Sequence, residues 1–366
     1  MKGHIKERSP GHWSIVLSVN EGGKRKLKWH SFKGNKRQAQ VECARLISEM
    51  QNGSYVAPTK LTMAQYFERW LTHIEPNVSA RTHERYSQLP RKNLAPVIGG
   101  KLLSKLQPID ITEAYAALVR DLSPRTVHHV HRALSSSLGQ AERWKLIARN
   151  PAALLERRDR PRIEKKPVTV IDAASTATVL DMARDRRLFV PVLLASLCGL
   201  RRGEIAALRW TAIDLERGQL AVVASTEQCD DGSIREKDSK SGKSRTVALP
   251  AMAIEELQRW KSQQAEELLK LGIVAGHVVT RADGEPLQPR SLTHVMSAFL
   301  KPWGLTLHGL RHTHASLLLA SGTHPKVVQE RLGHSSIAIT MDTYSHTLTS
   351  MQGEAAASLD RMLAKR

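Results

Sequence analysis

The sequence predicts a multidomain, mainly helical protein with small β elements. Its 366 residues correspond to two or three domains of about 150 residues each. Apolar residues follow helical spacing along most of the chain, and alternating strand patterns are confined to residues 11–30 and 219–249. A turn-rich stretch at 51–60 and a charged, proline-containing stretch at 156–168 read as linkers. We therefore expect three domains, spanning residues 1–57, 58–157 and 169–366.

The net charge is strongly positive. Lys and Arg number 55 against 35 Asp and Glu, which gives a formal charge of +20 and a pI near 10.1. A surplus of this size favours a polyanionic partner, and nucleic acid is the first candidate. Hydrophobic residues make up 41% and aromatic residues 4%, as expected for a soluble globular protein.

The sequence indicates neither export nor a membrane span. The longest apolar run, residues 188–200, contains Pro191 and is too short to cross a bilayer. The N-terminal MKGHIKERSPGHW has no apolar core of a signal peptide. The three cysteines are widely spaced, which argues against a disulfide framework or a zinc site: Cys43, Cys198 and Cys229. This cysteine usage suits a reducing cytoplasm.

The first domain is expected to carry a basic β-hairpin. Residues 11–30 predict two strands around a turn at 20–23, and a helix fits residues 36–50. The second strand is basic at four positions: Lys24, Arg25, Lys26 and Lys28. A small sheet backed by a helix can place its strands in a groove of DNA. The alternative is a charged hairpin without a partner.

The second domain reads as helical throughout. Helices are predicted at residues 63–73, from Ser79, at 111–122 and at 124–145. Basic residues scattered over them would give a positive face for DNA phosphates: Arg81, Arg91, Lys92 and Arg125. The tether that follows, at 156–168, would let two basic domains close around a duplex.

The third domain begins with helices at 173–184 and 188–198, and Gly199 ends the second. Arg201 then stands at the start of a short apolar helix, where free N–H groups and the helix dipole favour an anion. Glu204, three residues later, can hold an arginine by paired hydrogen bonds. The alternative is an ordinary surface cation before a helix.

A strand-rich stretch follows, with strands expected at 219–225, 227–241 and 245–249. Its hairpin is crowded with lysines: Lys237, Lys240 and Lys243. A lysine on a turn can reach a bound phosphate and donate a proton to it. The alternative is a solvated charged loop.

Residues 305–344 hold further ionisable side chains on predicted helices. His308 and Arg311, three residues apart, point the same way from one helix. After Gly322 a second short helix leads to His334 and so brings it back towards this pair. Tyr344 is the one tyrosine of the third domain. The alternative is a histidine-rich helical hairpin with a solvated polar face.

These motifs together resemble the tyrosine site-specific recombinases, the phage integrase family. The resemblance rests on their order and approximate spacing: Arg201 in GLRRGE, Lys240 in SKSGKSRTVALP, His308 and Arg311 in HGLR, His334 in LGH and Tyr344 in MDTYSH. In the second domain LTMAQYFERWL, LSPRTVHHVHRAL and LIARNPAALLE look like the core-binding domain of the family. The N-terminal hairpin and helix are similar to the arm-binding domain of larger integrases.

The resemblance implies a role for each residue. Tyr344 would attack the scissile phosphate and form a 3′-phosphotyrosyl link, and His308 would accept its proton. Three cations would bind the phosphate oxygens: Arg201, Arg311 and His334. Lys240, or in its place Lys243, would protonate the 5′ oxygen. His312 and His314 lie near His308 without a supporting acidic or cysteine cluster, so we expect neither a metal nor any other cofactor.

The implied function is integration or excision of a phage or mobile element, carried out in the bacterial cytoplasm in association with the nucleoid. Its partners would be double-stranded DNA attachment sites of core and arm types, a homotetramer in the synaptic complex, a DNA-bending host factor and an excisionase, with no membrane. Residues 355–363 have helical apolar spacing and would pack on a neighbouring protomer or on their own domain. The alternatives are a type IB topoisomerase and a DNA-binding regulator without catalysis.

Overall fold

The chain divides into two compact units, Met1–Glu164 and Lys165–Arg366. The computed structural model describes residues 2–21, 24–52, 55–56, 59–164, 168–238, 244–348 and 352–364. The boundary between the units falls inside the predicted tether at 156–168. Each unit has its own buried apolar cores, and each is described by itself.

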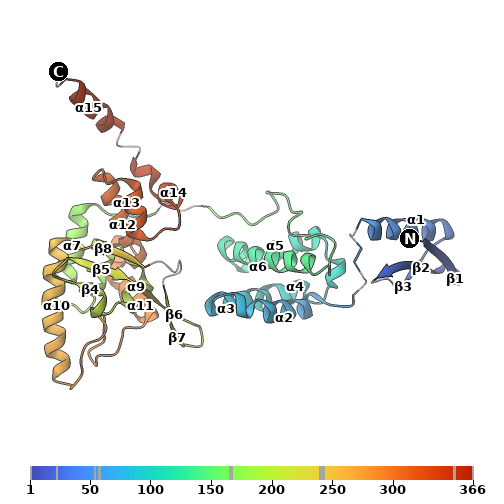
Figure 1. Ribbon diagram of the computed structural model, residues 1–366, viewed down its shortest axis with the longest axis horizontal. Coiled ribbons are helices and arrows are strands. Elements are labelled where there is room, and N and C mark those ends of the chain that lie inside the picture. Colours follow the sequence, from blue (N-terminus) through green and yellow to red (C-terminus); the bar gives the residue numbers. More distant parts are fainter. Residues whose placement is uncertain are drawn as a thin grey trace. The chain divides into compact units, whose positions relative to one another are not determined.

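The first unit begins with a three-stranded antiparallel sheet (Figure 1). The strands are β1 (Lys2–Ser9), β2 (His12–Glu21) and β3 (Lys24–Lys33), followed by α1 (Lys36–Gln51). The predicted hairpin and helix are thus present, but β1 is an additional strand. Its segment KGHIKERS has one large aliphatic residue and no apolar alternation, so its strand character depends on pairing with β2, which places Ile5 opposite Ile15.

Helix α1 covers one face of this sheet. Ile15, Leu17, Cys43 and Leu46 form the buried core between them. The backbone approaches closely at Gly3, where an added Cβ would lie 2.8 Å from the Cys43 sulfur and 2.9 Å from Leu17. Only glycine fits there without a shift of the helix or of its neighbours.

The rest of the first unit is helical. Its helices are α2 (Met63–Ile74), α3 (Ala80–Leu89), α4 (Ala95–Ile98), α5 (Pro108–Asp121) and α6 (Pro124–Arg143). Thr62, Ser79 and Ser123 each cap a helix N-terminus with a side-chain oxygen. Tyr66, Phe67 and other apolar side chains of α2 fill the core against α6, and the Tyr66 hydroxyl donates to the Ser137 carbonyl.

The second unit is built around a buried helix. Helices α7 (Ala173–Ala183) and α8 (Phe189–Cys198) precede the short α9 (Arg202–Ala207). Nine of the ten residues of α8 are buried, and α8 packs on α12. An apolar helix of this kind needs partners on every side.

Two small sheets follow α9. Strands β4 (Ile213–Asp214), β5 (Gln219–Val222) and β8 (Arg245–Ala248) form one sheet, and β6 (Ala224–Gln228) pairs with β7 (Ile234–Asp238) in a hairpin. The predicted strand at 219–225 is therefore split at Val223, where the chain passes from one sheet to the other. Lys240 and Lys243 lie outside the described residues.

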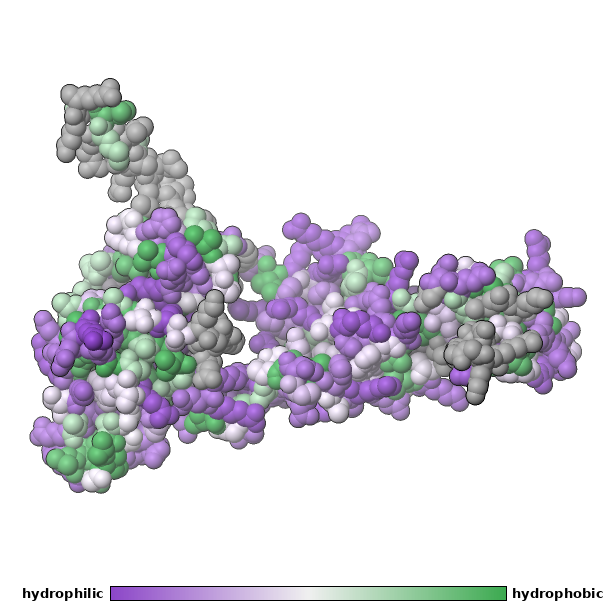
Figure 2. Space-filling model, viewed as in Figure 1, coloured by the Kyte–Doolittle hydropathy of each residue, from purple (hydrophilic) through white to green (hydrophobic). Residues whose placement is uncertain are grey.

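The chain ends in helices α10 (Ala251–Leu269), α11 (Pro289–Leu300), α12 (Leu307–Ala320), α13 (Pro325–Leu332), α14 (Ile337–Leu348) and α15 (Gln352–Leu363). Helices α12, α13 and α14 pack on one another (Figure 1). Polar residues cover much of the visible face, and an apolar group gathers at the end of α10 around Leu269 and Val274 (Figure 2). None of the helices in the described part of the chain could span a membrane.

Candidate active site

The candidate site lies in the second unit, where α9, α12, α13 and α14 meet. Glu204 organises its cationic side and is 6% exposed. One carboxylate oxygen accepts hydrogen bonds from the Arg201 and Arg245 side chains at 2.8 and 2.9 Å. The other accepts from Arg245 Nη2 at 2.7 Å and from the Arg201 backbone N–H at 2.8 Å. One buried carboxylate thus fixes two arginines.

The charge of Glu204 is strongly stabilised. Burial by itself raises the pKa of this carboxyl, but hydrogen bonds and charge from Arg245, together with Arg201, lower it to about 2. The predicted paired hydrogen bonds from an arginine to Glu204 are present, and the guanidinium that donates both of them is that of Arg245. Arg245 also donates from Nε to the Arg331 carbonyl at 2.8 Å and so connects β8 to the end of α13.

Arg201 occupies the N-cap position of α9, as the sequence predicts. Its Nη2 donates to the Gly333 carbonyl at 2.9 Å, directly before His334. Its side chain is 39% exposed, so N–H donors of the guanidinium can face a ligand while the bonds to Glu204 and Gly333 hold the group in place. Gly333 has a φ of +63° and ends α13, which favours glycine there.

Arg311 is almost fully buried, with 1% exposure. It donates to the Gly199 carbonyl and, at 2.6 Å, to the Leu332 carbonyl, so it connects the ends of α8 and α13. Burial, with the nearby charge of Arg201, lowers its pKa to about 9. A guanidinium has about five N–H donors, so two carbonyls leave donors for a phosphate.

Tyr344 is fully buried, and its hydroxyl makes a 2.6 Å hydrogen bond with His312 Nδ1. Burial raises the pKa of the phenol to about 12, although the charge of Arg311 opposes this. His312 is packed edge-on against His308, with ring centroids 4.5 Å apart and an interplanar angle of 82°. The expectation that His308 accepts the tyrosine proton stays a prediction.

His334 lies just after α13. Its Nδ1 shares a 2.9 Å hydrogen bond with the Thr340 hydroxyl, and its carbonyl accepts from the Gln329 side chain. Burial, followed by the charges of Arg311 and Arg201, lowers its pKa to about 4. A neutral imidazole with one nitrogen engaged can offer the other to a phosphate oxygen.

The fold brings together Arg201, Glu204, His308, Arg311, His334 and Tyr344, which are up to 143 positions apart in the chain. Electrostatic coupling reflects this proximity, because Arg201 and Arg311 both lower the pKa values of His308 and His334. Arg245 and His312 were not predicted from the sequence to be functional residues. For His312 the sequence did contain a signal, because this residue lies four positions after His308 on the same helix face.

The predicted DNA-contacting residues of the first unit are surface cations. Arg91 forms a two-bond ion pair with Glu68, and Arg81 contacts Glu84 at 2.7 Å. Lys26, Lys92 and Arg125 are exposed, and Lys28 lies over the Tyr55 ring at 5.1 Å. The side chains of Lys24 and Arg25 lie outside the described residues. A role in binding DNA remains a prediction for all of them.

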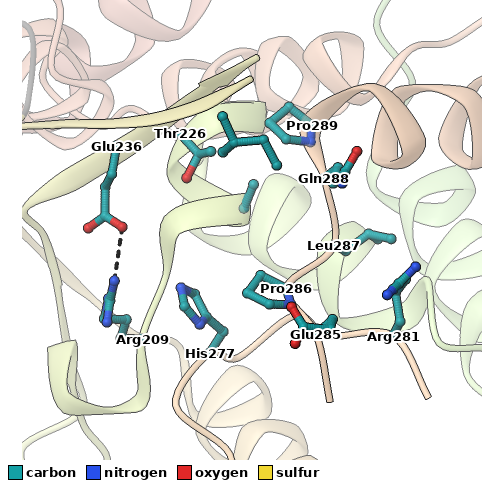
Figure 3. Close-up of a pocket in the computed structure, with 12 residues that line it drawn as sticks. Arg209, Thr226, Glu236, His277, Arg281, Glu285, Pro286, Leu287, Gln288 and Pro289 are labelled. Atoms are coloured by element: carbon teal, nitrogen blue, oxygen red, sulfur yellow. Dashed lines mark hydrogen bonds and ion pairs between the residues drawn. The ribbon is translucent and has the colours of Figure 1, made fainter. Parts of the chain in front are cut away.

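A cavity of about 320 Å³ lies elsewhere in the second unit, beneath the β6–β7 hairpin (Figure 3). Its lining includes His277, Arg281 and Glu285, and Arg209 donates to Glu236 at 2.9 Å across it. It shares no residue with the cluster around Tyr344. Among the described residues, no group of three or more His, Cys, Asp and Glu side chains is arranged to hold a metal.

The sequence profile of the phage integrase family matches residues 164–351, which is more than half of the chain. The chain belongs to the phage integrase family. The profile of the phage integrase N-terminal SAM-like domain matches residues 62–119. The protein is accordingly a tyrosine recombinase, an enzyme that breaks and rejoins DNA.

Similar proteins cover nearly the whole chain. A tyrosine recombinase XerC-like protein of Caldanaerobacter subterraneus is 25% identical, over 95% of this chain and 96% of its own. The Tn1549 transposon integrase, solved with transposon right end DNA, has a TM-score of 0.71 at 18% identity, covering 82% of this chain and 99% of that one. A λ integrase tetramer bound to a Holliday junction has a TM-score of 0.59 at 17% identity, covering 93% and 94%. At these identities the two structures show a shared fold.

Proposed function

We propose that this recombinase integrates and excises a mobile element, with Tyr344 as the nucleophile. The observation that carries the proposal is a buried tyrosine hydroxyl bonded to an imidazole beside buried and fixed arginines. A phenol in such surroundings can attack a phosphorus atom and keep the bond energy in a phosphotyrosine link. The products are then a 3′-phosphotyrosyl end and a free 5′-hydroxyl.

The cations around Tyr344 have complementary roles in this proposal. Arg201, Arg311 and His334 donate to the non-bridging oxygens, where negative charge increases in the transition state. Because Glu204 and backbone carbonyls hold the arginines in advance, little reorganisation is needed when the phosphate enters. Lys240, or Lys243 in its place, protonates the departing 5′ oxygen. The reaction requires no metal or other cofactor.

The DNA partners follow from charge and domain order. We assign residues 1–57 to binding of arm-type sites, 58–157 to binding of core sites and 169–366 to catalysis. The +20 charge and the exposed cations of the first unit support binding to DNA phosphates. The λ integrase of similar fold forms a tetramer on a Holliday junction, and we propose the same assembly for this chain. A DNA-bending host factor and an excisionase would then set the direction.

A nicked suicide substrate tests the proposed nucleophile. The DNA flanking the gene is the first source of candidate core sites, and covalent protein–DNA complexes are counted after denaturation. We expect the unsubstituted protein to be trapped and Tyr344→Phe to bind the site without being trapped. Trapping of Tyr344→Phe contradicts the assignment of the nucleophile. Relaxation of supercoiled DNA without strand exchange favours a topoisomerase instead.

A further inference from the structure

We propose that His312, rather than His308, accepts the proton of Tyr344 during DNA cleavage. The inference rests on the proposed function, in which Tyr344 is the nucleophile. The sequence motifs assign no catalytic role to His312, which was considered from the sequence only as a metal ligand. It would be a catalytic residue in direct contact with a reacting atom.

The geometry favours His312 over its neighbour. Its Nδ1 lies 2.6 Å from the Tyr344 oxygen, within the range for an O–H···N hydrogen bond, and helices α12 and α14 that carry the two residues pack together. For Nδ1 to accept, the ring must carry its proton on Nε2. His308 contacts the ring of His312 instead.

The surroundings of the two histidines also favour His312 as the acceptor of the tyrosine proton. Burial, then Arg311 and Arg201, lower the pKa of His308, so His308 lies in the field of the two arginines that would hold the phosphate. This position suits a donor or acceptor on the phosphate side. His312 lies on the tyrosine side, and the titratable and charged groups that interact with it include His308, Arg311 and His334, with Tyr344 in contact.

The protonation state is also suitable. Burial, with His308 and Arg311, lowers the pKa of His312 to about 4, so its acceptor nitrogen is free at neutral pH. The phenol, with a pKa raised to about 12, does not release its proton to this base before attack. The proton therefore moves as the O–P bond forms, when the phenol becomes far more acidic.

The step balances without any added reactant. The Tyr344 O–H bond breaks, its proton passes to Nδ1 of His312, and the phenolic oxygen forms a bond to phosphorus. The bond between phosphorus and the 5′ oxygen breaks, and that oxygen takes a proton from the general acid, proposed as Lys240. In rejoining, the 5′-hydroxyl gives its proton back to the group that supplied it, proposed as Lys240, and attacks the phosphorus. The bond between phosphorus and the Tyr344 oxygen breaks, and the His312 imidazolium returns its proton to that oxygen.

His312→Asn is the sharpest substitution. The Asn Oδ1 can take the place of Nδ1 and accept the hydrogen bond of the phenol, but it cannot take the proton. We expect single-turnover trapping on the nicked substrate to fall by about 10²- to 10⁴-fold, with half-site binding retained. The control is His294→Gln, on an exposed position of α11, which should cleave at the normal rate. Normal cleavage by His312→Asn overturns the inference.

A fluorinated tyrosine at position 344 separates proton transfer from positioning. A phenol that is already ionised near neutral pH needs no proton acceptor. We therefore expect the loss caused by His312→Asn to shrink to less than about 10-fold in this background. An unchanged loss means that His312 only positions the tyrosine, which overturns the inference while the nucleophile stands. Trapping of Tyr344→Phe is the separate result that overturns the proposed function.

A ¹⁵N NMR measurement on the unsubstituted protein tests the inference without a substitution at position 312 that could impair folding. The ¹⁵N shift of His312 in labelled protein distinguishes an unprotonated Nδ1 from an N–H. An unprotonated Nδ1 at pH 7, sensitive to Tyr344→Phe, supports the inference. An Nδ1–H overturns it, because His312 would then donate to the tyrosine oxygen.

Discussion

Two arginine–glutamate pairs of similar geometry occur in the two units. In the first unit Arg91 donates to Glu68 from Nε and Nη2 at 2.8 and 2.5 Å, with side chains 55% and 54% exposed. In the second unit Arg245 donates to Glu204 from Nη1 and Nη2 at 2.9 and 2.7 Å, with 13% and 6% exposure. Water competes for the first pair and is excluded from the second. The chemistry is the same, and burial decides its energetic weight.

This difference matches the tasks proposed for the two units. Exposed cations can exchange a carboxylate for a DNA phosphate at little cost, which suits binding of a polyanion. A reaction centre instead needs charges that are already in place before the substrate arrives. Glu204 supplies this by holding Arg201 and Arg245, and these arginines in turn hold the end of α13, just before His334.

The largest expected effect comes from breaking the buried pair. Glu204→Ala leaves the charges of Arg201 and Arg245 without their carboxylate, so we expect the free energy of unfolding of the second unit to fall by about 3 to 5 kcal/mol. Urea denaturation followed by hydrogen exchange at α9 measures it. The matched control is Glu68→Ala, which should cost about 0.2 to 1 kcal/mol in the first unit. Equal losses would mean that burial does not distinguish the pairs.

The next effect concerns Arg201, the member of the same network that is proposed to bind the scissile phosphate. Arg201→Lys keeps the charge but loses the planar fork, so we expect cleavage to slow by about 10²- to 10³-fold while half-site binding stays. Single-turnover trapping on the nicked substrate measures this. The control is Arg202→Lys, because Arg202 is exposed and bonded to Thr293. A smaller loss for Arg201→Lys than for Arg202→Lys would contradict the proposed role.

Acid should weaken the second unit through its buried histidines. His314 donates from Nδ1 to the Ser196 carbonyl and accepts from Arg331 at Nε2, and burial lowers its pKa to about 3. Below about pH 6.5 His314 is protonated in the unfolded chain but stays neutral in the folded protein. The free energy of unfolding therefore decreases as the pH falls from 6.5 towards 3. At pH 5.5 we expect a loss of about 1 kcal/mol from this group.

In His314→Gln the unfolding free energy should depend less on pH between pH 6.5 and 5, because up to about one proton fewer is taken up on unfolding. His294→Gln, on the surface, should not change it. The contribution of Glu204 is lost in a lower window, as the pH falls from its unfolded pKa near 4.5 to about 2. An unchanged slope in His314→Gln would exclude this histidine as the source.

The smallest effect is expected for a single exposed cation. Arg125→Ala should weaken binding to all DNA sequences alike and reduce the slope of log K against log salt concentration by about 0.9, as for one phosphate contact. Titrations at several salt concentrations measure the slope. Lys270→Ala, at the exposed end of α10, is the control and should leave it unchanged. A sequence-selective loss would indicate a base contact instead.

Much of the fold was predictable because its signals are local. Ser79 is a strong N-cap, and the alternation of residues 12–33 around a turn defines β2 and β3. The residues of the candidate site were proposed from the order of the motifs, since their spacing in the chain is a property of the sequence alone. The strand β1 was missed because its pattern becomes a strand only beside β2.

Tertiary structure decided which of these side chains meet. The sequence places a glutamate three residues after Arg201, but only the tertiary fold brings Arg245, 41 residues further along on β8, to this glutamate on α9. It places His308 and His312 on one helix face, but the way α14 lies on α12 determines that the Tyr344 hydroxyl reaches the second. Residue type and spacing fix what a side chain can do. Contacts between distant segments depend on burial and side-chain direction, which arise only when the whole core has packed.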